Sequence, residues 1–351
     1  MSLNGLRHLE DEAARELSQL ETTRLHLNGL EEIDDDTATA LVQWSGVILT
    51  LDGLEEIEAD TATALSQWEG EQYPQATRLS LNSVEEIDAD TATALSQWDG
   101  NVLFVRGLER LNTEAATALS EWEGDRLIMN GLKDIEVGSA TALSQWGGSE
   151  LELEGLESIT VDMANALSRS QVDTLSIRIE ILTDELATAF ESFEGELEIQ
   201  NLRRLGPAAA RVLVDRKNDR RRQEFPPTKH GPEYIYEERL LLNSLEAIDH
   251  EVATELVQWE GDKLLLNNLE EIDNEIASEL VQWEGEELSL NGLKAIDRET
   301  AETFAQWDGS KSSLNGLDSL DDSVAAVLVE FDGELIVSAE IRERIDEILS
   351  Q

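Results

Sequence analysis

The sequence predicts an α/β solenoid, a chain of short strand-turn-helix units stacked side by side. Residues 49–70 read LTLDGLEEIEADTATALSQWEG and residues 79–100 read LSLNSVEEIDADTATALSQWDG, so one unit is copied almost unchanged. Within each copy the apolar spacing switches from two residues, typical of a strand, to the three or four residues of a helix. A unit this small cannot bury both of its apolar faces alone, so it must stack on its neighbours.

One unit illustrates how each element is specified. Leu49 and Leu51 lie two residues apart, as a short strand requires if both are to face one side. Residues 58–61 read EADT, and such short polar or acidic side chains favour a helix N-terminus. Trp68 closes the apolar pattern, and Gly70 provides a plausible helix stop.

The pattern LxLxGLxxIxxxxAxALxxWxG covers almost the whole chain and resembles the leucine-rich repeat family. It looks like a bacterial-type member, most similar to the subclass with a buried cysteine after the strand and an isoleucine three residues later. Leu54 and its equivalents take the cysteine position here. The resemblance implies a parallel β-sheet on the concave face and helices on the convex face.

The repeats divide the chain into four segments. We expect repeats 1–9 in residues 1–216, a basic insertion loop in 217–238, repeats 10–13 in 239–333, and a capping strand and helix in 334–351. Ile341, Ile345 and Ile348 fall on one face of that last helix. Trp is replaced in the seventh to ninth units, which predicts the weakest stacking near residues 160–240.

The first unit begins without a polar cap, because Met1 and Leu3 already occupy strand positions. An uncapped strand is a template for pairing with another chain. We therefore expect either a longer natural protein, or an edge covered by a partner, including edge-to-edge self-association.

The composition is strongly acidic, with 76 Asp and Glu against 26 Lys and Arg and a formal net charge of -50. Such a field repels nucleic acid and anionic membranes and attracts basic proteins. A saline habitat would explain the same acidity without any role in binding. The absence of Cys excludes disulfides and thiol chemistry. No apolar run has the length of a membrane span and no signal-peptide core is present, which predicts a cytoplasmic protein.

Two repeated columns are interpreted as structural ladders rather than binding residues. One follows each helix and contains Trp44, Trp68, Trp98, Trp122, Trp146, Trp259, Trp283 and Trp307. The other follows each strand and contains Asn4, Asn28, Asn82, Asn130, Asn243, Asn267, Asn291 and Asn315. Asparagine side chains at such positions can satisfy backbone groups of the turn.

The column between the two inward-facing strand residues varies, and it is predicted to face the concave side. Its members are His26, Thr50, Ser80, Phe104, Ile128, Glu152, Ser176, Glu198, Leu241, Leu265, Ser289 and Ser313. Val102, Phe104 and Ile128 are expected to form one exposed apolar patch, and Leu241 and Leu265 a second. Contiguous exposed apolar side chains indicate a binding surface.

Scarce bases collect in another column, directly before the first inward-facing residue of each strand. They are Arg24, Arg78, Arg126, Arg239, Lys263 and Lys311. Two interpretations remain open: an anion-binding row, or pairing with acids of the same column such as Glu150 and Glu287.

The insertion reverses the local charge, since residues 203–230 hold nine Lys or Arg and three acids. Three prolines, at 226, 227 and 232, argue against a regular helix there. It is either a flexible loop or a docking arm, since long insertions in compact arrays are commonly functional or disordered. The expected contacts of an arm are Arg220, Arg221, Arg222, Phe225, Tyr234 and Tyr236.

No catalytic, cofactor or metal motif stands out. Acids recur at helix starts, where capping explains them without calcium, and the four His occupy unrelated repeat positions. The sequence therefore predicts a non-enzymatic scaffold that binds a protein partner, with a basic protein as one candidate, without binding nucleic acid or membrane itself. The alternative is an acidic nucleic-acid mimic that occupies a basic DNA- or RNA-binding protein.

Overall fold

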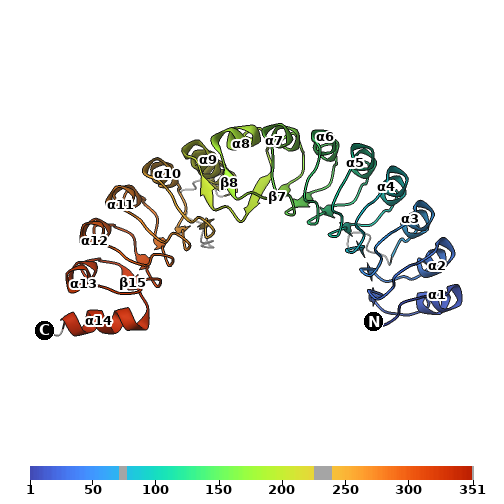
Figure 1. Cartoon of the computed structure of the whole chain (residues 1–351), viewed down its shortest axis with the longest axis horizontal. Coiled ribbons are helices and arrows are strands. Elements are labelled where there is room, and N and C mark those ends of the chain that lie inside the picture. Colours follow the sequence, from blue (N-terminus) through green and yellow to red (C-terminus); the bar gives the residue numbers. More distant parts are fainter. Residues whose placement is uncertain (71–76, 225–238, 350–351) are drawn as a thin grey trace. The chain divides into compact units, whose positions relative to one another are not determined.

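The computed structural model describes residues 1–70, 77–224 and 239–349 as strand-helix repeats (Figure 1). They form two compact units, the first of residues 1–179 and 189–200 and the second of residues 180–188 and 201–351. The division falls where Ser170 and Phe193 stand in the tryptophan column, within the region predicted to stack least well.

Parallel strands form the sheets of both units, and the predicted α/β, leucine-rich-repeat-like solenoid is confirmed. Within the described residues the first unit has one sheet in the order β1 (Arg24–His26), β2 (Ile48–Thr50), β3 (Arg78–Ser80), β4 (Val102–Phe104), β5 (Arg126–Ile128), β6 (Glu150–Leu153), β7 (Thr174–Arg178) and β9 (Glu196–Gln200). The second unit has two sheets within the described residues. One pairs β10 (Arg204–Leu205) with β8 (Ile181–Leu182). The other has the order β11 (Arg239–Leu241), β12 (Lys263–Leu265), β13 (Glu287–Ser289), β14 (Lys311–Ser313) and β15 (Glu334–Ile336).

Helices alternate with the strands and lie on the opposite side of each unit, except that β8 follows β7 directly and β10 follows β9 directly (Figure 1). The helices are α1 (Asp11–Ser18), α2 (Asp35–Leu41), α3 (Ala59–Ser66), α4 (Ala89–Ser96), α5 (Thr113–Ser120), α6 (Val137–Leu143), α7 (Val161–Leu167), α8 (Asp184–Phe190), α9 (Pro207–Glu224), α10 (His250–Leu256), α11 (Asn274–Leu280), α12 (Arg298–Phe304), α13 (Asp322–Leu328) and α14 (Ala339–Leu349). In the described part of the chain, no helix combines the length and apolarity needed to cross a membrane.

The repeated apolar columns form the interior between strands and helices. Leu49, Leu51, Leu54 and Ala62 are fully buried, and the register places Leu49 beside Leu25 and Leu79 of the neighbouring strands. Stacking thus hides surface that one isolated unit would expose, which is how a repeat array becomes stable.

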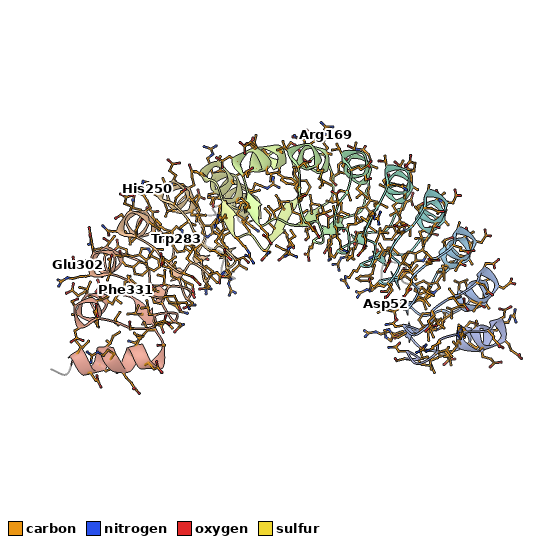
Figure 2. The ribbon with its side chains drawn as sticks, in the orientation of Figure 1. Asp52, Arg169, His250, Trp283, Glu302 and Phe331 are labelled. Atoms are coloured by element: carbon orange, nitrogen blue, oxygen red, sulfur yellow. The ribbon has the colours of Figure 1, made fainter. Side chains whose placement is uncertain are left out.

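The tryptophan column is a structural ladder, as predicted. The rings of Trp98 and Trp122 stack with centroids 6.0 Å apart, and the indole N–H of Trp122 donates to the carbonyl oxygen of Trp98 at 2.8 Å. Phe331 continues the stack of the second unit, 5.9 Å from Trp307. Figure 2 shows Trp283 and Phe331 inside that unit, between its strand side and its helix side.

The asparagine column and the helix caps also behave as predicted. The side-chain oxygen of Asn130 accepts the backbone N–H of Glu154 in the next repeat at 3.0 Å. Asp88 caps α4 by accepting the backbone N–H of Thr91 at 2.7 Å. Capping of this kind recurs at Asp34, Asp249, Asp273 and Asp297.

The insertion departs from the predicted loop. Residues 217–224 continue α9, because the first helix-breaking proline comes only at position 226. The side chain of Asn218 is buried and binds the end of α10, donating to the carbonyl oxygen of Gln258 and accepting the N–H of Glu260, both at 2.9 Å.

At the C-terminal end, α14 follows β15. Its Ile341 and Ile345 are buried and Ile348 is half-buried, so the predicted apolar face packs inward. The segment boundaries proposed from the sequence otherwise remain predictions.

Candidate functional site on the strand face

The strand face comprises the outward-pointing first and third residues of each strand, with the residue two positions further on. In the first unit the first row is Arg24, Ile48, Arg78, Val102, Arg126, Glu150, Thr174 and Glu196. The second row is His26, Thr50, Ser80, Phe104, Ile128, Glu152, Ser176 and Glu198. The third row is Asn28, Asp52, Asn82, Arg106, Asn130, Glu154, Arg178 and Gln200. Figure 2 shows Asp52 on the strand side and Arg169 on the helix side of this unit.

The predicted apolar patch of the first unit is largely covered. Val102 is 3% exposed and Ile128 is 0% exposed, so the expectation that both are exposed is wrong. The register places Val102 between Arg78 and Arg126, whose longer side chains can shield it. Ile128 is flanked in the same way by longer side chains.

Phe104 is the accessible member of this patch. Its ring is half-buried, and the guanidinium carbon of Arg106 lies 4.9 Å from the ring centroid. A guanidinium over an aromatic face is attracted by the electron density of the ring. Arg106 and Phe104 therefore form one mixed cationic and aromatic element, which sequence reasoning missed although Arg106 follows Phe104 by only two positions, in the turn after β4.

The second predicted apolar pair lies on the strand face of the second unit. Leu241 and Leu265 are neighbours in the register of β11 and β12. Leu241 is 58% exposed, and Leu265 is half-buried. The two residues thus lie side by side with accessible surface, while their role in binding stays a prediction.

The residues predicted for the basic arm fall partly inside and partly outside the described residues. Arg220, Arg221 and Arg222 belong to the last turns of α9. Phe225, Tyr234 and Tyr236 lie outside the described residues, as does the short strand expected near the tyrosines.

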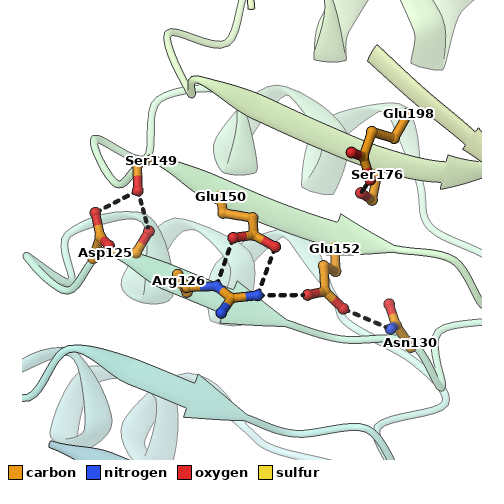
Figure 3. A network of polar contacts seen from close by, with 8 residues as sticks. All are labelled: Asp125, Arg126, Asn130, Ser149, Glu150, Glu152, Ser176 and Glu198. Atoms are coloured by element: carbon orange, nitrogen blue, oxygen red, sulfur yellow. Dashed lines mark hydrogen bonds and ion pairs between the residues drawn. The ribbon is translucent and has the colours of Figure 1, made fainter. Parts of the chain in front are cut away.

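A network of charged side chains crosses β5 and β6 (Figure 3). The guanidinium of Arg126 lies 2.6 Å from the carboxylate of Glu150 and 3.2 Å from that of Glu152. Glu152 also accepts a hydrogen bond from the side-chain amide of Asn130 at 2.9 Å. On the next two strands, the hydroxyl of Ser176 donates to Glu198 at 3.0 Å. Each carboxylate of this network has a donor.

The bases of the first row form ion pairs with acids of the same row where a neighbouring strand supplies one. Besides Arg126 with Glu150, Lys263 lies 2.7 Å and Lys311 3.5 Å from Glu287 on the strand between them. Of the two interpretations left open by the sequence, pairing is therefore confirmed for these residues. Among the described residues, Arg24 and Arg78 have no carboxylate of their row beside them, because their strand neighbours in that row are Ile48 and Val102.

Burial and like charge perturb the acids of β6. Burial raises the pKa of Glu150, against the lowering effect of Arg126. Burial also raises the pKa of Glu154, helped by the negative charges of Glu152 and Glu198. The same stretch lacks an arrangement for metal binding, since no group of three or more His, Asp or Glu that could hold a metal occurs in the described ranges.

The strand face of the first unit therefore has two electrically different parts. The rows of β1 to β5 carry Arg24, Arg78, Arg106 and Arg126 against one carboxylate, Asp52. The rows of β6, β7 and β9 carry Glu150, Glu152, Glu154, Glu196 and Glu198 against one base, Arg178. Ordered donors and acceptors at fixed spacing can recognise a partner through directed hydrogen bonds and charge.

Comparison with known proteins adds the following findings. No known family model matches the sequence, and a search of curated proteins finds no match. Among solved structures, an internalin of Listeria monocytogenes is 14% identical with a TM-score of 0.47, over 92% of this chain and 82% of the internalin. The structure of Rad7 and Elc1 in yeast is 17% identical with a TM-score of 0.42, over 95% of this chain and 85% of the other. The Toll and Spatzle structure of Drosophila is 12% identical with a TM-score of 0.47, over 94% of this chain and 40% of the other.

Proposed function

We propose that this chain is a non-enzymatic recognition module that binds a protein partner through its strand face. The observation that supports the proposal best is the position of the residues that differ between repeats. The buried leucine, alanine and tryptophan columns are nearly constant, whereas the outward residues of successive strands change in size and charge. The constant buried residues can therefore maintain the fold while the varying outward residues determine which partner is bound.

The ordering of the strand face supports the same proposal. The side chains of Arg126, Glu150 and Glu152 are held together by ion pairs, and Ser80 and Asp52 by a hydrogen bond. Side chains that are ordered before binding lose less conformational entropy when the partner arrives. Phe104, Leu241 and Leu265 supply accessible apolar surface, and the basic segment that begins at Lys217 is proposed to add contacts through Arg220 to Arg222.

Site-specific cross-linking tests this proposal. The natural chain has no Cys, so a single introduced Cys is the only attachment point for a photo-activated cross-linker. Glu198→Cys places the cross-linker on the strand face of the first unit, and Leu241→Cys places it on the strand face of the second. Both residues are exposed, so the introduced thiol can be labelled. Arg169→Cys and His250→Cys are the matched controls on exposed helix-side positions.

We expect the same protein, identified by mass spectrometry, to be cross-linked from the strand-face positions and not from the controls. Phe104→Glu together with Leu265→Glu should then abolish the cross-link while the far-UV circular dichroism stays unchanged. Equal cross-linking from Arg169→Cys and His250→Cys would contradict the proposal.

The alternative proposal is the acidic mimic of nucleic acid. The observation that favours it is a groove between the third and fourth repeats, whose lining includes the carboxylates of Glu55, Glu56, Glu58, Glu85, Glu86 and Asp88. A partner held there by charge would dissociate steeply as salt rises, because the screening length falls from about 10 Å at 0.1 M to about 3 Å at 1 M. A strand-face complex with apolar contacts should persist across the same range.

A further inference from the structure

We propose that the strand face of β1 to β4 binds an acidic peptide segment in extended conformation, through the guanidinium groups of Arg24, Arg78 and Arg106. This inference rests on the proposed function and names the chemistry of the partner at one part of that face. The charge of this stretch is opposite to that of the whole chain, and complementarity to an acidic ligand is its simplest use.

The three arginines are available for binding. All three are exposed, and within the described residues none of their guanidinium groups has a carboxylate at ion-pair distance. The chain has nearly three acids for each base, so an unpaired arginine is not explained by a shortage of carboxylates. Arg126 provides the contrast, because it is half-buried and paired with Glu150 and Glu152.

The spacing of Arg24 and Arg78 suits an extended chain lying across the strands. The register places Arg24 beside Ile48, and Ile48 beside Arg78, so the two arginines are two strands apart. Neighbouring strands are about 4.8 Å apart, which separates the two Cα atoms by about 10 Å. Residues three positions apart in an extended peptide are separated by about 10 Å as well. Carboxylates at positions i and i+3 of a peptide would match both arginines.

The surroundings of the arginines favour a peptide over a simple anion. The half-buried Ile48 lies between Arg24 and Arg78, where the residues between two acids of a peptide would pass. The ring of Phe104 holds Arg106 in place at 4.9 Å. The one carboxylate of this stretch, Asp52, is engaged by the hydroxyl of Ser80 and by the backbone N–H of Asn82.

Hydroxyl and imidazole groups order the rest of this stretch. His26 Nδ1 lies 3.0 Å from the hydroxyl of Thr50, which in turn donates to the side-chain oxygen of Asn28.

The net charge of the chain argues for a peptide rather than a nucleic acid. A formal net charge of -50 opposes the approach of any polyanion. Duplex DNA carries one charge for about every 1.7 Å of axis, whereas a short peptide carries only the two or three carboxylates that its sites can pair. At physiological ionic strength the screening length is about 8 Å, so a contacting carboxylate senses the local arginines more than distant acids.

The experiment measures peptide binding to the full chain by fluorescence anisotropy at physiological salt. The probe is a labelled nonapeptide of Ala and Ser with Glu at positions 2, 5 and 8. One control peptide has Gln at these positions, and a second has its three Glu at positions 2, 3 and 4. We expect the first peptide to bind most tightly, since its acids at positions 2 and 5 have the spacing of Arg24 and Arg78.

The variants assign the binding to this surface. Arg78→Gln should weaken the first peptide about threefold to fivefold, as expected for one exposed ion pair, and Arg24→Gln with Arg78→Gln about tenfold. Arg169→Gln removes the same charge from the helix side and should leave binding unchanged. Circular dichroism of each variant checks that the fold is intact.

Three results would overturn the inference: equal binding of the Glu and Gln peptides, an equal effect of Arg169→Gln, or tighter Arg78-dependent binding of a nine-nucleotide oligothymidine. If the peptide experiment gives one of these results while cross-linking from Glu198→Cys is still observed, only the assignment of an acidic peptide as the ligand is rejected. Loss of strand-face cross-linking as well removes the proposed function.

Discussion

Gly148→Ala tests whether the tryptophan ladder explains the glycine that follows it. An ideal Cβ at Gly148 would lie 2.1 Å from Cζ2 of Trp146 and 2.7 Å from the carbonyl oxygen of Gly124. The ring has little room to shift, since it stacks on Trp122 at 5.9 Å and donates its N–H to the carbonyl oxygen of that residue at 2.9 Å. The neighbouring Gly147 is exposed, and a Cβ there would meet nothing within 4 Å.

The two substitutions are therefore expected to have opposite signs. Neither glycine has a positive φ, so an alanine at either position should gain about 0.4–1 kcal/mol by reducing the freedom of the unfolded chain. At Gly148 the steric conflict should cost about 1–3 kcal/mol, which exceeds that gain. We expect Gly148→Ala to lower the free energy of unfolding by about 1–2 kcal/mol, and Gly147→Ala to leave it unchanged or raise it.

Urea unfolding of the full chain, followed by far-UV circular dichroism and by tryptophan fluorescence, measures the difference. Repeat arrays can unfold in parts, so agreement between the two probes is required before a free energy is extracted. Equal stability of the two variants would refute the steric explanation of the repeated W-x-G pattern. Loss of stability in Gly147→Ala alone would refute it as well.

Three further predictions concern the caps, the core and the strand face. Asp88→Ala should cost about 1 kcal/mol, and the loss should shrink in acid. The reason is that the N–H and hydroxyl of Thr91 lower the pKa of Asp88, so its stabilisation is present above the unfolded pKa of about 4 and disappears as pH falls through the folded pKa. Urea unfolding at pH 7 and pH 3 measures this, and an equal loss at both would contradict it. Ser312→Ala should raise the free energy of unfolding by about 1 kcal/mol, because this buried hydroxyl has no hydrogen-bond partner among the described residues. Its control Ser289→Ala should lower stability, since that hydroxyl donates to Asn267 at 2.6 Å, and thermal unfolding of both variants would expose a wrong sign. Arg126→Gln should destabilise by about 1 kcal/mol at neutral pH and less in acid, because burial raises the pKa of Glu150 and the protonated carboxyl needs no cation. A loss that grows as pH falls would contradict this explanation.

The interior of the repeats could be predicted from the sequence. Leu49, Leu51 and Trp68 occupy positions whose neighbours are equivalent residues of the adjacent copies, and Asp88 caps the helix of its own copy through Thr91. Local periodicity therefore indicates both the element and what it packs against. The asparagine column follows the same logic, since Asn130 contacts the equivalent position one repeat later.

Side chains where neighbouring repeats differ could not be predicted in this way. The sequence did not reveal that Ile128 is covered, that Arg106 lies over Phe104, or that Arg126 binds Glu152 as well as Glu150. These outcomes depend on the lengths and rotamers of unlike side chains on adjacent strands. The course of α9 beyond Lys217 likewise depends on the burial of Asn218 against the end of α10.

Periodicity alone therefore establishes the solenoid, because each copy packs on a copy of itself and a single pattern specifies the contacts of the repeated leucine, alanine and tryptophan columns. Accessibility and pairing on the strand face arise only when the units are stacked, because stacking brings together non-equivalent side chains about 4.8 Å apart that are distant in the chain. On that face Arg126 forms ion pairs with Glu150 and Glu152, while Arg24 and Arg78 remain exposed.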